Sequence, residues 1–134
     1  MLNSPLPLPV TLTTASILTL LCIALIVRVG HGRFQHRVAM GDGGNSDMLV
    51  RMRTHANFVE YVPIILILMG ILEMSKVSRI ALAVMGAVLI LSRVLHAIGM
   101  PRPAPNIFRA SGAGLSALVM FICAVWGLFL VFTA

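Results

Sequence analysis

The chain has 134 residues, of which 59% are hydrophobic and only 10% are charged, and its mean hydropathy is +1.01. A soluble domain would carry about a quarter charged residues, so the composition excludes that class and indicates one membrane domain over residues 1–134. The formal charge of +6 comes from ten Lys and Arg against four Asp and Glu. Most bases lie between apolar segments without interleaved aromatic residues, so we expect no nucleic-acid partner.

The first apolar segment follows a proline-containing leader, Met1 to Pro9, that has no basic residue. Secretory signals begin with positive charge, so we expect a retained membrane span, predicted over residues 10–29. Thr11, Thr13 or Thr14 could cap its start.

A polar, glycine-rich loop is predicted from Gly30 to Asn45, with the tetrad Gly-Asp-Gly-Gly at residues 41–44. Such a tetrad could belong to a phosphate-binding loop, but no Lys-Ser or Lys-Thr follows it and no strand precedes it. A tight turn is therefore the prediction for this tip.

The second span is predicted over residues 48–73, with Ser46 or Asp47 as its N-cap. Pro63 lies inside this span and is expected to kink the helix, because proline lacks a backbone donor. A short break leads to a third span, predicted over residues 78–99.

A stiff loop at residues 100–106, Met-Pro-Arg-Pro-Ala-Pro-Asn, separates the third span from a fourth over residues 107–133. Gly112 and Gly114 would allow close helix contact in the fourth span. The predicted fold class is therefore all-α, an integral membrane four-helix bundle.

Four spans place the first and third loops on one side of the membrane. Eight arginines lie in those loops and the adjoining helix ends: Arg28, Arg33, Arg37, Arg51, Arg53, Arg93, Arg102 and Arg109. The other side holds only Lys76 and Arg79. The positive-inside rule therefore predicts that the arginine-rich side is cytoplasmic and that both termini lie outside.

A polar stripe begins the second span. Arg53, Asn57 and Glu60 stand at i, i+4 and i+7 and so share one helix face. A charged residue at the bilayer centre costs about 2.5–3.5 kcal/mol, so this face must meet protein, water or a ligand. A structural polar cluster that holds the helices together is the simpler interpretation.

More polar residues fall at the same bilayer level, namely Arg93 and His96 near the end of the third span and Arg109 at the start of the fourth. The excess positive charge in a partly desolvated place favours a bound anion. Alternatively, these arginines reach lipid headgroups, an interpretation that suits Arg102 well and also covers Arg109.

The second span carries a specific motif, Arg53-x-His55-x-Asn57-x-x-Glu60-Tyr61-x-Pro63. The pair Arg93-x-x-His96 in the third span and Arg109 in the fourth follow it along the chain. This pattern resembles the MAPEG family, the membrane-associated proteins of eicosanoid and glutathione metabolism, and most closely its small bacterial members. The resemblance covers nearly the whole chain. It implies a homotrimer in a bacterial inner membrane, with three glutathione sites, each between neighbouring subunits.

The resemblance also implies roles for individual residues, with glutathione as co-substrate and no metal. The implied binding residues are Arg28 or Arg33, Arg53, His55, Asn57, Glu60, Tyr61, Arg93 and His96. Arg28 or Arg33 would close the pocket, and His55 would reach the neighbouring subunit's ligand. Arg109 matches the arginine held to activate the thiol and is the expected catalytic residue. Glutathione has two carboxylates and one ammonium, which arginines and one glutamate complement.

The expected function is a membrane-embedded glutathione transferase or peroxidase that acts on small lipophilic electrophiles. Met100 and Ala110 stand where eicosanoid-forming relatives have tyrosine and serine, so an eicosanoid substrate is not favoured. One alternative is a non-catalytic scaffold that binds lipid or glutathione. Another is a small transporter with Glu60 and His96 as a proton relay, which four spans without an internal repeat disfavour.

Overall fold

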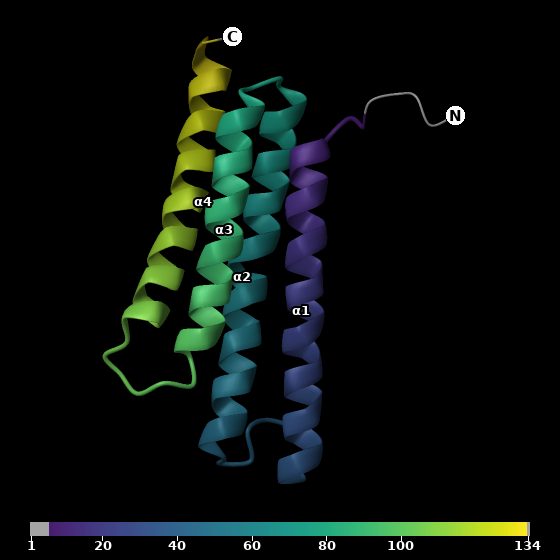
Figure 1. Cartoon of the computed structure of the whole chain (residues 1–134), viewed down its shortest axis with the longest axis vertical. Coiled ribbons are helices and arrows are strands. Elements are labelled where there is room, and N and C mark those ends of the chain that lie inside the picture. The colour runs from purple at the N-terminus through teal and green to yellow at the C-terminus, as the bar shows by residue number, and fades with distance from the viewer. Residues whose placement is uncertain (1–5, 134) are drawn as a thin grey trace.

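The computed structural model describes residues 6–133, so the first five residues of the leader and the last residue lie outside it. Four helices account for most of this range: α1 (Pro9–His36), α2 (Ser46–Met74), α3 (Arg79–Gly99) and α4 (Ile107–Thr133). They run alternately up and down, so the start of α1 and the end of α4 lie at the same end (Figure 1). All four are long and apolar enough to cross a membrane, which confirms the predicted all-α membrane bundle.

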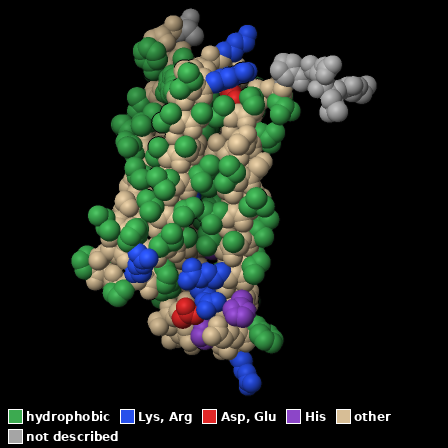
Figure 2. Space-filling view, in the orientation of Figure 1, with side chains coloured by type: hydrophobic (Ala, Val, Ile, Leu, Met, Phe, Trp, Pro, Cys, Tyr) green, Lys and Arg blue, Asp and Glu red, His purple; other side chains and the backbone are tan. Residues whose placement is uncertain are grey.

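The core of the bundle is a column of buried apolar side chains along its length. They are Leu18, Leu25, Phe58, Val62, Ile65, Met69, Leu72, Leu82, Met85, Leu89, Val119 and Cys123. The most extensive packing joins α3 to α4 and α1 to α2, and α2 also packs on α4. Many large apolar side chains face outward, and Figure 2 shows them covering the middle of the molecule. Such a surface suits lipid rather than water.

Charged side chains gather at the two ends of the bundle. Most of the arginines lie at the end that holds the α1–α2 and α3–α4 loops, drawn at the bottom of Figures 1 and 2. We call this the basic end. Lys76 and Arg79 lie at the opposite end, beside the turn between α2 and α3.

The prediction that Thr11, Thr13 or Thr14 caps the first helix was wrong, because α1 begins before these residues, at Pro9. Its N-cap is Leu8, which has no side-chain capping bond, and Pro9 occupies the first turn, where proline fits best. The exposed backbone donors are satisfied from another helix. The carboxylate of Glu73, at the end of α2, accepts from the backbone nitrogens of Val10 and Thr11 at 2.9 and 2.8 Å.

The same helix also continues past Val29 to His36, so the predicted loop from Gly30 was too long. An isolated glycine costs a helix only about 1 kcal/mol, and basic side chains in the last turn favour its C-terminus. The helix ends at His36, and its C-cap is Arg37, which has a left-handed backbone with φ 55°.

The tight turn predicted for residues 41–44 is confirmed. Its three glycines have φ values of 62°, 60° and 73°, and the Asp42 carboxylate accepts from the backbone nitrogen of Gly44 at 3.0 Å. Asn45, rather than Ser46 or Asp47, then caps α2, because its side-chain oxygen accepts from the Met48 nitrogen at 3.0 Å. The turn thus places the start of α2, which carries the polar face, at the basic end.

Candidate binding cavity at the basic end

A cavity of about 240 Å³ lies at the basic end between α2, α3 and α4. Its lining residues are Leu49, Val50, Arg53, Asn57, His96, Met100 and Arg109. Arg53 and Asn57 share a face because they are four residues apart on α2. The side chains of Arg53 and Arg109 are exposed, whereas His96 is buried. The cavity therefore has two arginines at its rim and less accessible polar groups in its wall.

Arg93 lies behind this wall and is only 2% exposed. Its Nη1 donates to Oδ1 of Asn57 and its Nη2 donates to the carbonyl of Gly112, both at 2.9 Å. The guanidinium carbon also lies 5.5 Å from the centre of the Tyr61 ring, a cation–π distance. Since the amide oxygen of Asn57 is occupied, its NH₂ group remains to donate to a ligand.

One donor of Arg93 has no partner among the described residues. Its Nε is buried and makes no hydrogen bond. A buried donor left unpaired costs about 1–3 kcal/mol, and more when the group is charged. Because this nitrogen has almost no accessible surface, its missing hydrogen bond is a cost of burying the guanidinium and not a contact open to the cavity.

Gly112 allows α4 to approach α3 closely at this level. A Cβ added at Gly112 would lie 2.5 Å from the backbone nitrogen of His96 and 2.7 Å from the carbonyl oxygen of Ser92. One turn further along, the hydroxyls of Ser92 and Ser116 lie 2.6 Å apart in a buried hydrogen bond. This close packing brings the Gly112 carbonyl within reach of Arg93.

The comparisons with known proteins agree with this architecture. Residues 11–129 match the model of the MAPEG family. The chain belongs to the MAPEG family. It is 36% identical over 99 residues to the inner membrane protein YecN of Escherichia coli K12. The matched region covers 70% of this chain and 73% of YecN. The same values hold for YecN of Escherichia coli O6:H1. No solved structure gives a significant match.

Family membership confirms the predicted resemblance, and this MAPEG chain is an integral membrane protein with four spanning helices. The residues that the family motif singles out do not all reach the cavity, however. Arg53, Asn57, His96 and Arg109 line it. Arg93 lies behind Asn57 and donates to its side chain, and the Tyr61 ring contacts the Arg93 guanidinium.

Other residues of the motif lie outside the cavity of a single chain. Glu60 is exposed on the same face of α2 and has no hydrogen-bond or ion-pair partner among residues 6–133. His55 is half-buried and does not contribute to the lining. Arg33 donates to the carbonyls of Ala39 and Gly41 at 3.3 and 3.2 Å, so it braces the α1–α2 loop.

Arg28 is also outside the lining, and among residues 6–133 only its backbone carbonyl makes a long-range hydrogen bond. That carbonyl accepts from Nη1 of Arg51 at 3.1 Å. The Nε of Arg51 donates to Asp47 at 2.8 Å, and His36 lies 2.9 Å from the same carboxylate oxygen. This network ties the end of α1 to the start of α2. The sequence interpretation counted Arg51 only as a topology residue, although its spacing of four from Asp47 is a typical helix ion-pair signal.

The apolar part of the lining was also missed. Leu49 and Val50 lie one turn before Arg53 and two turns before Asn57, and Met100 lies one turn after His96. These helical spacings could have identified them, because residues four apart cover neighbouring parts of the same surface. The cavity therefore joins a polar wall to an apolar one.

Proposed function

We propose that this protein is a glutathione-dependent transferase or peroxidase that activates the glutathione thiol for attack on small lipophilic electrophiles from the bilayer. The observation that carries the proposal is the lining of the cavity. Two arginines and an asparagine amide meet there, and the described lining residues include no acid. Donors without acceptors suit an anionic ligand.

The polar groups of glutathione fit these donors. The guanidinium of Arg53 can bind a carboxylate through two parallel hydrogen bonds. Asn57 lines the cavity and its oxygen accepts from Arg93, so its NH₂ group is left to donate to a second acceptor.

Arg109 is the residue that we propose to activate the thiol. A thiol of pKa about 8.5 is only a few per cent thiolate at neutral pH. A nearby cation that lowered this pKa by about two units would stabilise the thiolate by about 2.7 kcal/mol. Arg109 lies in the first turn of α4, where the helix N-terminus adds positive potential.

The remaining motif residues support a site completed by other copies of the chain. Glu60 faces outward from a single chain, next to the cavity face of α2. We propose a homotrimer in which α2 lines the centre, Glu60 binds the ammonium of glutathione, and Arg28 or Arg33 of a neighbouring copy closes the site. His55 would reach the neighbouring copy's ligand.

We also propose that the protein lies in a bacterial inner membrane with its basic end in the cytoplasm. The printed name of YecN, an inner membrane protein, supports the compartment. The excess of arginine at the basic end supports the orientation, because cytoplasmic loops carry such an excess.

The experiment that tests the proposal adds glutathione to detergent-purified protein and follows the ultraviolet absorbance of the thiolate. Turnover with a generic electrophile such as chlorodinitrobenzene is measured in parallel. We expect thiolate to form in proportion to bound glutathione and turnover to follow it. Binding without thiolate or turnover would favour a non-catalytic scaffold instead.

A further inference from the structure

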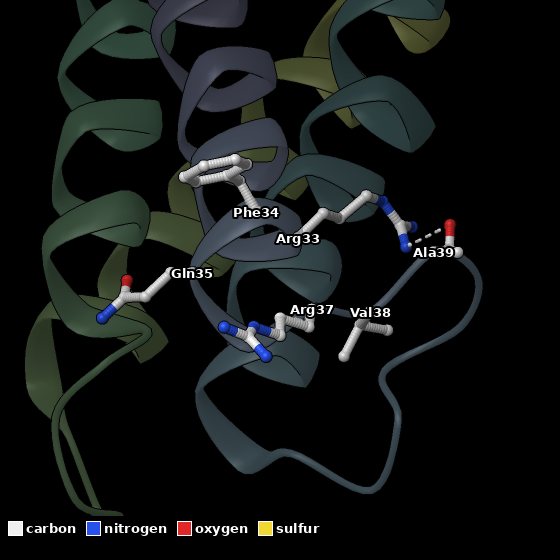
Figure 3. A pocket seen from close by; sticks show the side chains of 6 residues that line it. All are labelled: Arg33, Phe34, Gln35, Arg37, Val38 and Ala39. Atoms are coloured by element: carbon white, nitrogen blue, oxygen red, sulfur yellow. Dashed lines mark hydrogen bonds between the residues drawn. The ribbon is translucent and has the colours of Figure 1, made fainter.

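A second basic concavity lies at the end of α1, apart from the cavity between α2, α3 and α4. Its volume is about 640 Å³, and its lining residues are Arg33, Phe34, Gln35, Arg37, Val38 and Ala39. Figure 3 shows Arg33 reaching to the carbonyl of Ala39 on one side, while Arg37 and Gln35 extend toward the other. None of these residues lines the cavity that contains Arg109.

The basic end carries more positive charge than its own acids or glutathione can offset. Eight arginines lie there, and the acids at that end are Asp42, Asp47 and Glu60. Only Arg51 forms an ion pair with an acid among the arginines of residues 6–133. Glutathione, with two carboxylates and one ammonium, would add a net charge of only about minus one. Further anionic charge is therefore expected near the remaining arginines.

Arg37 is well placed to meet that charge. It is exposed, follows directly after α1, and makes no ion pair with the described acids. Arg33 lies four residues earlier, and its guanidinium is already held by the carbonyls of Ala39 and Gly41.

Helix lengths indicate the depth of this surface in the membrane. The 21 residues of α3 extend about 31 Å, close to the hydrocarbon thickness of about 30 Å. The 28 residues of α1 extend about 42 Å, and Figure 1 shows α1 continuing past the end of α3 at the basic end. The last turns of α1 therefore lie at the level of the lipid headgroups.

Apolar side chains accompany the arginines at this level. Phe34 is 87% exposed and Met40 is 89% exposed, so neither packs within its own chain. In water, such exposure would be unfavourable. At the headgroup boundary, however, apolar side chains next to Lys or Arg typically insert toward the acyl chains while the cations contact phosphate.

We propose that the end of α1 binds the headgroup of an anionic phospholipid. In this arrangement Arg37 and Gln35 donate to the lipid phosphate and glycerol oxygens, and Phe34 packs against the upper part of an acyl chain. Arg33 holds the loop in shape and adds positive potential. The lipid contacts of Arg37, Gln35 and Phe34 do not depend on glutathione binding, because none of these three residues lines the cavity or is assigned to the glutathione site.

The test titrates delipidated, glutathione-free protein in detergent with dioleoyl-phosphatidylglycerol or dioleoyl-phosphatidylcholine and counts bound lipids by native mass spectrometry. We expect the wild type to retain phosphatidylglycerol in preference to phosphatidylcholine. Arg37→Gln should bind phosphatidylglycerol about fivefold more weakly, the effect of one basic residue near an anionic membrane surface. Arg79→Gln, which removes an exposed arginine at the opposite end, should bind as the wild type does.

A second pair of variants tests the aromatic contact. Phe34→Ala should lose phosphatidylglycerol, whereas Phe132→Ala, which removes an 83% exposed ring near the end of α4, should keep it. Unchanged lipid retention in Arg37→Gln, or equal retention of the two lipids by the wild type, would overturn the proposal. Displacement of lipid by equimolar inorganic phosphate would assign the surface to a free anion. Loss of association between copies in Phe34→Ala, with lipid retained, would assign it to a protein interface.

Discussion

The side chain of Arg93 connects three helices at the level of the cavity. It extends from α3 to an amide on α2 and a carbonyl on α4, and it is almost fully buried. Because one of these bonds fixes the amide of Asn57, the position of Arg93 determines which group the cavity wall offers to a ligand. Its charge has no acidic partner within the described chain, so hydrogen bonds and the Tyr61 ring must stabilise it.

Replacing Arg93 by lysine tests this connection. We expect Arg93→Lys to lower the free energy of unfolding by about 1.5–3 kcal/mol, because the compact ammonium lacks the planar fork that directs separate donors to the acceptors on α2 and α4. Unfolding in mixed detergent and dodecyl sulfate micelles, followed by circular dichroism, measures the change. Arg79→Lys, at an exposed position, is the control and should be neutral. Equal stability of Arg93→Lys and the wild type would show that the two bonds contribute little.

At the scale of helix pairs, the contact between α3 and α4 depends on the absence of a side chain at Gly112. We expect Gly112→Ala to destabilise the protein by about 1–3 kcal/mol, since the new methyl group would clash with the backbone of α3. Gly114→Ala is a matched control in the same helix, because a Cβ there meets nothing within 4 Å. The control should keep its stability or gain up to about 1 kcal/mol. Similar thermal unfolding midpoints for both variants would contradict the proposed close approach.

At the end of the bundle opposite the basic end, the Glu73 carboxylate on α2 joins α1 to α2 by capping the start of α1. We expect Glu73→Gln to cost about 0.5–2 kcal/mol, because an amide keeps only one acceptor for the two backbone donors of α1 and loses the favourable charge at the helix N-terminus. Glu60→Gln makes the same chemical change at an exposed position. Measured without glutathione, it should leave the unfolding free energy unchanged. A larger loss for Glu60→Gln would argue against the capping role of Glu73.

The four helices were predictable because each has a long apolar run with polar residues or prolines at its ends. The end of α1 was not predictable, since Gly30 and the polar residues after it are typical of loops. The helix continues there beside α2, where Arg51 donates to the Arg28 carbonyl. The cap supplied by Glu73 was missed for a similar reason. Its partners are 62 and 63 residues away in the sequence, so no local pattern reports them.

Part of the candidate site was predictable in the same way. Helical spacing alone placed Arg53 and Asn57 on one face, and both line the cavity. The inward position of Arg93 behind that face depends on Gly112, which admits α4 close to α3. Spacing on a single helix cannot give this arrangement, because it arises from the contact between two helices.

Considered as a whole, the molecule has an apolar middle, a small charged end and a larger basic end (Figure 2). The polar face of α2, with Arg53 and Glu60 exposed and Asn57 half-buried, continues into Ile64 and Ile67, both more than half exposed. A charged and amide-bearing stripe is costly against lipid, so contact with further copies is expected.

The association of copies is directly measurable. We expect native mass spectrometry in mild detergent to give the mass of three chains, about three times 14.4 kDa. Crosslinking through a cysteine introduced at Ile67 should join copies, while one introduced at Phe129 on α4 should not. A monomeric mass under conditions that retain glutathione binding would contradict the trimer and require each chain to form its own site.

The most direct test of the account compares Arg109→Ala with the wild type for glutathione binding and thiolate absorbance in one titration. We expect the variant to keep much of its affinity but to lose the thiolate band and most turnover with chlorodinitrobenzene, because Arg53 and Asn57 remain to bind the ligand. Arg109→Lys should keep part of the band, as a point charge in the same place. Arg102→Ala, an exposed arginine outside the cavity lining, should behave as the wild type does. If Arg109→Ala forms thiolate as readily as the wild type, Arg109 does not activate the thiol and the central claim fails.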